Sequence, residues 1–340
     1  MNLSIETNHK TNLCSTEITS LWTQYMSDSM SISVINYMLE KAQDKDIRSI
    51  LEFSIGLSEK HVRTIRKFFN AENYPIPFGF TSEDVDLQAP RLFSDTFFLK
   101  YLHIMAAHGI TGYAVSLTTA VRSDLREYYT ECSNEAMKLY NITLDLMLAK
   151  GIYTRPPYLY PPEKSQYVKK QNFLTGWFGN RRPLNGIEIS NISFNMNKTV
   201  MGKAMVLGFS QVAKTKEVRE YLMRGTQISS KHVEIFSSIL HEDNLPCPPS
   251  WDSEVTNTTV SPFSDKLIMF HTGLLTQASV AFYGAALAVC MRRDLGVQYT
   301  RLIGEMEQYG EDGGNIMINN SWMEQPPTAD DRVALAEDKN

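Results

Sequence analysis

The chain has 340 residues, of which 43% are hydrophobic and 21% are charged, and its formal net charge is -5 at pH 7. This composition is ordinary for a globular protein, and the slightly acidic balance gives no reason to expect a nucleic acid partner. The four cysteines form no Cys-x-x-Cys pair, so neither a structural zinc site nor a disulfide framework is indicated.

The N-terminal segment and the apolar runs bear on localisation. Met1 to Thr16 is polar and lacks the basic start and apolar core of a signal peptide. No apolar run approaches the roughly 18 to 20 residues that a membrane span needs. We therefore expect a cytoplasmic protein with reduced thiols and no membrane span.

Four long helices are predicted in the first part of the chain, because apolar and small side chains recur there every three or four residues. In chain order they are Glu17 to Ala42, Ile47 to Phe68, Ser94 to Val121 and Leu125 to Gly151. The stripe that should face the core on the first helix consists of Ile18, Trp22, Tyr25, Ser29, Ile32, Asn36 and Leu39. On the second helix, the core stripe includes His61.

The second and third helices are joined by a long proline-rich connection, Asn73 to Pro90. It is too long for a tight turn between antiparallel neighbours and long enough to run the length of a bundle. Four helices with one long connection between the second and the third form the ferritin-like variant of the four-helix bundle.

The chain then repeats itself. Residues 58–62, Ser-Glu-Lys-His-Val, return as Ser-Ser-Lys-His-Val 171 positions later, and Phe-Ser-Asp at 93–95 returns 170 positions later. This unit is far longer than solenoid repeats of about 20 to 50 residues, so each copy should be a domain. The helices of the second copy are predicted at Ile189 to Ala213, Lys216 to His241, Ser264 to Cys290 and Asp294 to Asn319.

The predicted fold is therefore all-α, a tandem duplication of a ferritin-like four-helix bundle with a long crossover in each copy. The expected division is a first bundle at 1–162, a linker at 163–187, a second bundle at 188–327 and a charged tail at 328–340. Basic residues alternate with aromatic ones in the linker, a pattern that can bind single-stranded nucleic acid. We favour the simpler interpretation that its aromatic residues, Tyr167, Phe173, Trp177 and Phe178, pack against the bundles.

Three strings resemble a known family: residues 172–185 (NFLTGWFGNRRPLN), residues 208–214 (GFSQVAK) and residues 312–327 (DGGNIMINNSWMEQPP). They are similar to the duplicated ferritin-like proteins of unknown function found in endospore-forming bacilli. The C-terminal part of each copy is more weakly similar to spore coat protein F. The resemblance covers nearly the whole chain and implies the double ferritin-like fold. It also implies a forespore or spore-coat location as an alternative to the cytoplasm, but it brings no catalytic residues.

A dinuclear iron or manganese bundle takes one Glu from each of two helices and a Glu-x-x-His motif from each of the other two. The histidine of that motif is present twice, as His61 and His232, but serine replaces its glutamate at Ser58 and Ser229. The fourth helices offer one mid-helix carboxylate each, Glu135 and Glu305, without the histidine three residues on. The full dinuclear set therefore cannot be assembled in either bundle.

The remaining candidate metal ligands are His61, Glu135 and His103 in the first copy and His232 and Glu305 in the second. We favour a structural role for the repeated histidines, each hydrogen-bonded to a buried Glu or Tyr. The alternative is a mononuclear site in one bundle. His103 and His108 lie roughly 140° apart around their helix and cannot share a site, and His103 is expected to be the inward one.

Adjacent glycines in the last long helix, Gly313 and Gly314, lack the ligand pattern of a calcium loop. They more simply permit close helix approach or a kink.

Two functions are consistent with these patterns. The leading hypothesis is a non-enzymatic structural or interaction protein linked to sporulation or the spore coat, with unidentified protein partners and no cofactor. The alternative is an iron- or manganese-binding oxidoreductase or metal store with an atypical site in one bundle. A third hypothesis, an apolar ligand held between helices, is disfavoured because methionine and phenylalanine at helical spacing usually form plain core. Duplication also suggests a pseudo-dimeric chain, with a homodimer as a further option.

Overall fold

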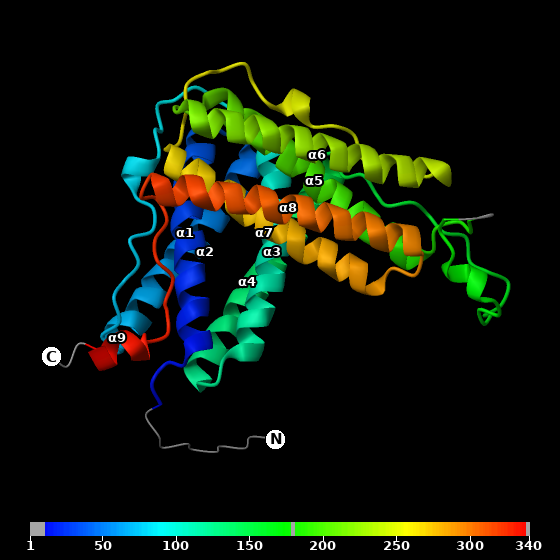
Figure 1. Ribbon diagram of the computed structural model, residues 1–340. Helices are drawn as coiled ribbons and strands as arrows, with labels where there is room; N and C mark the ends of the chain where they lie inside the picture. Colours follow the sequence, from blue (N-terminus) through cyan, green and yellow to red (C-terminus); the bar gives the residue numbers. More distant parts are fainter. Residues whose placement is uncertain (1–10, 178–180, 338–340) are drawn as a thin grey trace.

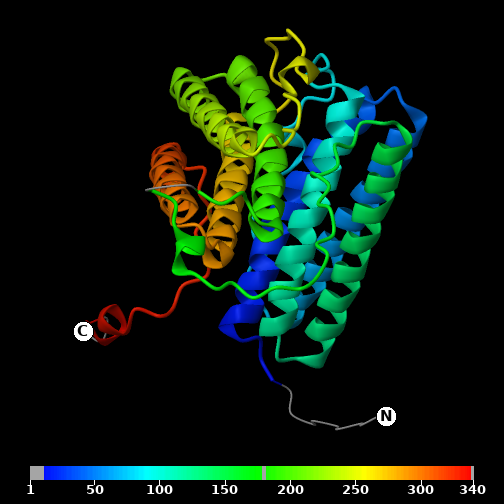
Figure 2. The same ribbon diagram turned by 90° about the vertical axis from the view of Figure 1, so that its right-hand side faces the viewer.

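In the computed structural model, which describes residues 11–177 and 181–337, the chain folds into two helical bundles that lie side by side (Figures 1 and 2). The first contains α1 (Ser15–Lys41), α2 (Lys45–Ala71), α3 (Asp95–Thr119) and α4 (Ser123–Ala149). The second contains α5 (Gly186–Val212), α6 (Lys216–Glu242), α7 (Asp265–Val289) and α8 (Arg293–Asn319). The predicted all-α tandem duplication is confirmed.

Short elements fill the connections. They are the 3-10 turns η1 (Ser82–Asp84), η2 (Gln171–Leu174) and η3 (Asp252–Glu254) and the final helix α9 (Arg332–Glu337). Within the described ranges the only β-type pairings are two isolated bridges. The expectations for residues 1–10, for Phe178 and for the last three residues lie outside the described part of the chain.

Consecutive helices pair as hairpins, α1 with α2 and α3 with α4 in the first bundle, and α5 with α6 and α7 with α8 in the second. The repeated Ser-Asp pair builds this arrangement. Ser94 Oγ caps α3 by accepting a hydrogen bond from Phe97 N at 3.1 Å, while the Asp95 carboxylate accepts one from Asp44 N, in the α1–α2 turn, at 2.8 Å. Ser264 and Asp265 do the same for α7 and the α5–α6 turn. The motif thus joins the two hairpins of each bundle at one end.

The predicted stripe of the first helix is partly wrong. Ile18, Trp22 and Ile32 are only partly buried, whereas Leu21 and Asp28 are buried. The physical reason is that α1 packs within its own bundle and also lines, with α7, a cavity between the two copies. Burial therefore spreads around the helix instead of following a single stripe. On α2, by contrast, the predicted inward position of His61 is confirmed.

The linker prediction is also partly wrong. Tyr167 is 93% exposed and Trp177 is 54% exposed, so neither packs firmly against a bundle. Phe173 is partly buried and lies under the Arg182 guanidinium, 4.1 Å from its ring centroid.

The two copies meet about a pseudo-two-fold axis. Backbone hydrogen bonds between the crossovers join Asp86 to Pro262 and Thr256 to Leu92 (2.8 and 2.9 Å), and Ser94 to Glu254 and Ser264 to Asp84 (both 3.0 Å). Adding 170 to the residue number in the first copy and subtracting 170 from the number in the second turns each bond of a pair into the other bond of that pair. A contact with this symmetry is isologous. On the same axis, Tyr101 Oη lies 3.3 Å from Nε2 of its own counterpart, His271.

Within the described residues, α7 is the one helix whose length and mean hydropathy, 1.3 over its most apolar window, would allow it to cross a membrane. In the structure it packs against α8 and α5 in the second bundle. Of the residues in that window 22% are buried, so the bundle covers only part of this apolar helix.

The contact between the copies can be tested at Gly208 on α5. A Cβ atom there would lie 2.6 Å from Phe93 Cε1 of the first copy, and Phe93 is buried and stacked on Phe97. Because the ring cannot move aside, we expect Gly208→Ala to lower the free energy of unfolding by about 1–3 kcal/mol in urea titrations. Gly202→Ala, on the same helix with open space around it, should raise it by up to about 1 kcal/mol. Equal stability of the two variants would refute this packing.

His271 gives a second test. Burial, with a smaller effect from His108, lowers the pKa of His271 to about 3. A histidine whose pKa falls on folding binds fewer protons in the folded state, so its contribution to stability decreases as the pH drops below about 6.5.

Between pH 7.5 and 5.0, the free energy of unfolding should therefore fall by about 2 kcal/mol more in the parent than in His271→Phe. Urea titrations at both pH values measure this difference. His103 and His108, whose pKa values burial also lowers, are present in both proteins, so their contributions largely cancel. Identical pH dependence in parent and variant would show that His271 is not buried as described.

Candidate metal centre

The repeated histidine of each bundle lies against a carboxylate of the fourth helix. His61 Nε2 on α2 is 2.9 Å from Glu135 Oε2 on α4, and His232 Nε2 on α6 is 3.1 Å from Glu305 Oε2 on α8. The histidines are 3% and 1% exposed. The structure thus brings together the His and the Glu that the sequence marked in each copy.

A lysine holds the other oxygen of each carboxylate. Lys60 Nζ lies 2.5 Å from Glu135 Oε1, and Lys231 Nζ lies 2.7 Å from Glu305 Oε1. Burial acts to raise the pKa of both glutamates, but the neighbouring lysine and histidine outweigh it and lower the pKa in each case. This Lys–Glu–His unit is common to both bundles.

The first bundle adds a second carboxylate. Asp28 on α1 is 6% exposed, and its Oδ2 lies 3.2 Å from His61 Nδ1. Burial alone would lower the pKa of His61, but the hydrogen bond and charge of Asp28, followed by hydrogen bonds with Cys132 and Glu135, raise it to about 12. Sequence reasoning missed Asp28. The available signal was an acidic residue seven positions after Leu21 on an otherwise apolar helix face.

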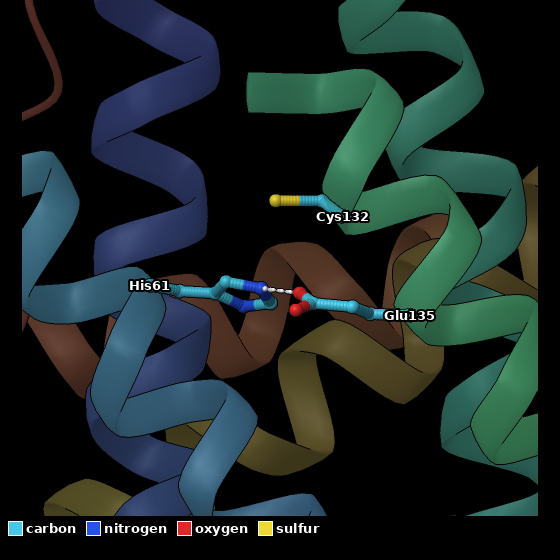
Figure 3. A group of neighbouring side chains, drawn as sticks. All are labelled: His61, Cys132 and Glu135. Atoms are coloured by element: carbon cyan, nitrogen blue, oxygen red, sulfur yellow. Dashed lines mark hydrogen bonds and ion pairs between the residues drawn. The ribbon is translucent and has the colours of Figure 1, made fainter. Parts of the chain in front are cut away.

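A thiol completes the group. Cys132 lies one turn before Glu135 on α4, so the two side chains project from the same face of the helix. A ring nitrogen of His61, the Cys132 sulfur and a Glu135 oxygen lie within 4.8 Å of one another, and Figure 3 shows them converging from α2 and α4. Gln24 Nε2 donates to Cys132 Sγ at 3.7 Å. Cys132 was not predicted either, because a single cysteine among the apolar residues of a helix has the same pattern as an ordinary core residue.

The second bundle differs at both of these added positions. Thr199 occupies the place of Asp28 and Leu302 that of Cys132. His232 Nδ1 instead lies 3.2 Å from Tyr283 Oη, which is 3.1 Å from Thr199 Oγ1. Burial lowers the pKa of His232 despite the opposing effect of Glu305, so this imidazole is neutral. In the described residues no third His, Cys, Asp or Glu side chain joins His232 and Glu305 in a group that could hold a metal ion.

His103 does not belong to the centre. It is buried, as expected, but it lines a different cavity, together with Tyr140 and Tyr153, and its Nδ1 lies 3.1 Å from Thr143 Oγ1. The reason is that α3 has two buried faces, one toward its own bundle and one toward the second copy. His108 meets the second copy as well and stacks on Phe282, with ring centroids 5.4 Å apart.

A small cavity lies beside each histidine. The one in the first bundle has a volume of about 90 Å³ and is lined by Asp28, Ser54, Ser58 and His61 among others. Its counterpart in the second bundle has about 40 Å³. The serines that replace the motif glutamates therefore border open space that is large enough for water.

The fold and this centre define a class, a duplicated four-helix bundle with a His–Glu pair in each copy. The chain belongs to the DUF3231 family of proteins of unknown function, whose family model matches residues 3–164 and again residues 172–335. The repeated match confirms the resemblance to a duplicated family.

Among solved structures, a Bacillus halodurans protein described as a candidate spore coat protein is similar to part of the chain. It is 15% identical, the match covers 44% of this chain and 98% of that one, and the TM-score is 0.40. This likeness is too distant to support an argument about function. No curated protein sequence matches the chain.

The role of Asp28 can be tested in metal-free protein with Asp28→Asn. We expect the His61 ring to be charged at pH 8 in the parent and neutral in the variant, because the loss of one carboxylate leaves burial dominant, as at His232. The ¹⁵N chemical shifts of the ring nitrogens report the charge directly. The variant leaves the other polar groups around the ring unchanged, namely Lys60, Glu135, Cys132 and Tyr113.

The matched control in the second bundle is Thr199→Val. A His61 ring that stays charged in Asp28→Asn would contradict the role assigned to Asp28.

Proposed function

We propose that the first bundle binds one thiophilic divalent ion, zinc or ferrous iron, and that the second bundle is its metal-free structural counterpart. The observation that carries this proposal is the convergence of His61, Cys132 and Glu135, with Asp28 on the other ring nitrogen of His61. The second bundle retains the His–Glu pair but lacks both added groups.

The three donors suit a tetrahedral ion with one open position. Zinc bonds of about 2.0–2.3 Å place tetrahedral ligand atoms roughly 3.3–3.8 Å apart. The donor atoms of His61, Cys132 and Glu135 lie within 4.8 Å of one another, so a movement of about 1 Å would bring them to an ion. Three protein ligands leave a fourth position for water or a substrate.

Asp28 has the position of a supporting group. A metal-bound histidine usually donates its other ring N–H to a carboxylate or carbonyl, which fixes the tautomer and the ring orientation. With Asp28 at Nδ1, the Nε2 atom faces Glu135 on α4, the helix that also carries Cys132. An ion bound at Nε2 would displace the proton that the charged, metal-free ring carries there. Thr199 cannot provide this support to His232.

The thiol also bears on which ion would bind. Thiolate and imidazole ligands suit zinc and iron, whereas manganese prefers oxygen ligands. Of the two ions in the hypothesis drawn from the sequence, iron therefore remains a candidate and manganese is disfavoured. Zinc is added as a second candidate. The open position would let a bound ion polarise a substrate or activate water.

Metal analysis tests the proposal. Metal-free protein reconstituted with cobalt(II), a spectroscopic substitute for zinc, should take up one ion per chain and show a sulfur-to-cobalt charge-transfer band. Cys132→Ser should lose the band, and Asp28→Asn should weaken binding by about 10–100-fold, the usual effect of removing a supporting carboxylate. Thr199→Val, at the position in the second bundle that corresponds to Asp28, is the control and should change neither. No uptake, two ions per chain, or an unchanged band in Cys132→Ser would each refute the proposal.

A second candidate is a purely structural or interaction role, without a cofactor or enzymatic activity. It is favoured by the Lys–Glu–His unit, which both bundles contain and which needs no metal to join the second and fourth helices. A link to sporulation or the spore coat belongs to this candidate. The cobalt experiment separates the two, because a structural role predicts no stoichiometric uptake.

A further inference from the structure

Two cavities between the bundles are related by the pseudo-two-fold axis. One, of about 360 Å³, is lined by α1, α7, α8 and the segment after α8. The other, of about 220 Å³, is lined by the equivalent elements α5, α3, α4 and the segment after α4. Equivalent wall positions include Met147 and Met317 on the fourth helices and Pro156 and Pro326 after them.

Three wall positions give the smaller cavity a different chemistry. Lys100, His103 and Tyr140 line it, whereas the larger cavity has Phe270, Gly273 and Gly310 at the corresponding places. The duplication thus provides a built-in comparison between a cavity with a lysine in its wall and an equivalent cavity without one.

Lys100 is an unusual wall residue because it is only 6% exposed. Its Nζ lies 3.2 Å from the centroid of the Trp251 ring, a cation–π contact, where the other cavity has the ring pair Phe80–Phe270. In the described parts of the chain, no carboxylate lies within ion-pair distance of this ammonium group. Burial lowers the pKa of Lys100 to about 8, against a weaker opposing effect of Glu254. Buried charges are normally paired, so this one lacks an anion.

A further wall residue has unused hydrogen-bonding capacity. Trp251 is 7% exposed, and its Nε1 donor is buried without a partner among the described residues. A ligand that accepted a hydrogen bond from this nitrogen would remove the cost of leaving it unpaired. His103, on the same wall, is already hydrogen-bonded, with Nδ1 3.1 Å from Thr143 Oγ1.

We propose that the cavity lined by Lys100, His103 and Trp251 binds a small monocarboxylate with a flat apolar body, its carboxylate paired with Lys100. The volume corresponds to about seven water molecules in the liquid, which suits a molecule the size of benzoate. Tyr140, Tyr153 and Phe194 supply aromatic walls for the apolar body. The ligand is expected to carry a single negative charge, because Lys100 is the one cation in the wall. The wall has no arginine, whose paired N–H donors phosphate groups favour.

Calorimetric titration of the full chain with benzoate and with its neutral analogue benzamide tests this proposal. We expect benzoate to bind at one site per chain, at least about tenfold more tightly than benzamide, because only the carboxylate pairs with the buried ammonium. Lys100→Met, which keeps the side-chain volume but removes the charge, should abolish the preference. Thr23→Val, in the wall of the larger cavity, is the matched control and should bind like the parent.

A second variant covers the case in which Lys100→Met fails to fold. Ala107→Phe places a ring in the same cavity from α3 without touching the charge and should prevent benzoate binding. Equal binding of benzoate and benzamide, parent-like benzoate binding in Lys100→Met, or no binding up to about 10 mM would overturn the proposal. A negative result for this cavity would not count against the proposed metal centre, because the two sites share no lining residue.

Discussion

A carboxylate on the fourth helix of each bundle, held between a lysine and a histidine of the second helix, is the interaction on which the architecture depends. It joins the first hairpin to the second at the middle of the bundle, while the Ser-Asp motif joins them at one end. The histidine is buried, whereas the glutamate is only partly buried and the lysine reaches solvent, so removing the carboxylate would leave a buried imidazole without its partner. Each copy therefore retains the unit, whatever else has changed around it.

Around this common unit the copies have diverged. The first has Asp28 and Cys132, which raise the pKa of His61, whereas the second has Thr199 and Leu302, and burial lowers the pKa of His232. The cavities between the bundles have diverged in the same manner, through Lys100 in one and Phe270 in the other. In both places the first copy carries an ionisable side chain where the second has a threonine or an apolar residue. This asymmetry is what one expects when one copy carries a chemical function and the other supports the fold.

The sequence predicted what depends on local patterns. Periodicity, helix caps and the repeat predict the helices, the long crossovers and the inward direction of His61. Gly313 allows a close helix approach, as expected, and the group that approaches it is the Tyr221 hydroxyl. What depends on contacts between distant segments was not predictable. The core face of α1 shifts because the second copy also covers it, and Asp28 gains its importance only from its distance to His61. The crossover hydrogen bonds, between residues about 170 positions apart, leave no mark in local periodicity.

The central claim is that the first bundle contains a metal centre that the second lacks. An anomalous diffraction map from crystals of zinc-loaded protein tests it most directly. The account predicts one anomalous peak, between the side chains of His61, Cys132 and Glu135, and none beside His232. A map with no peak at this position, with peaks in both bundles, or with two ions bridged by carboxylates would contradict it.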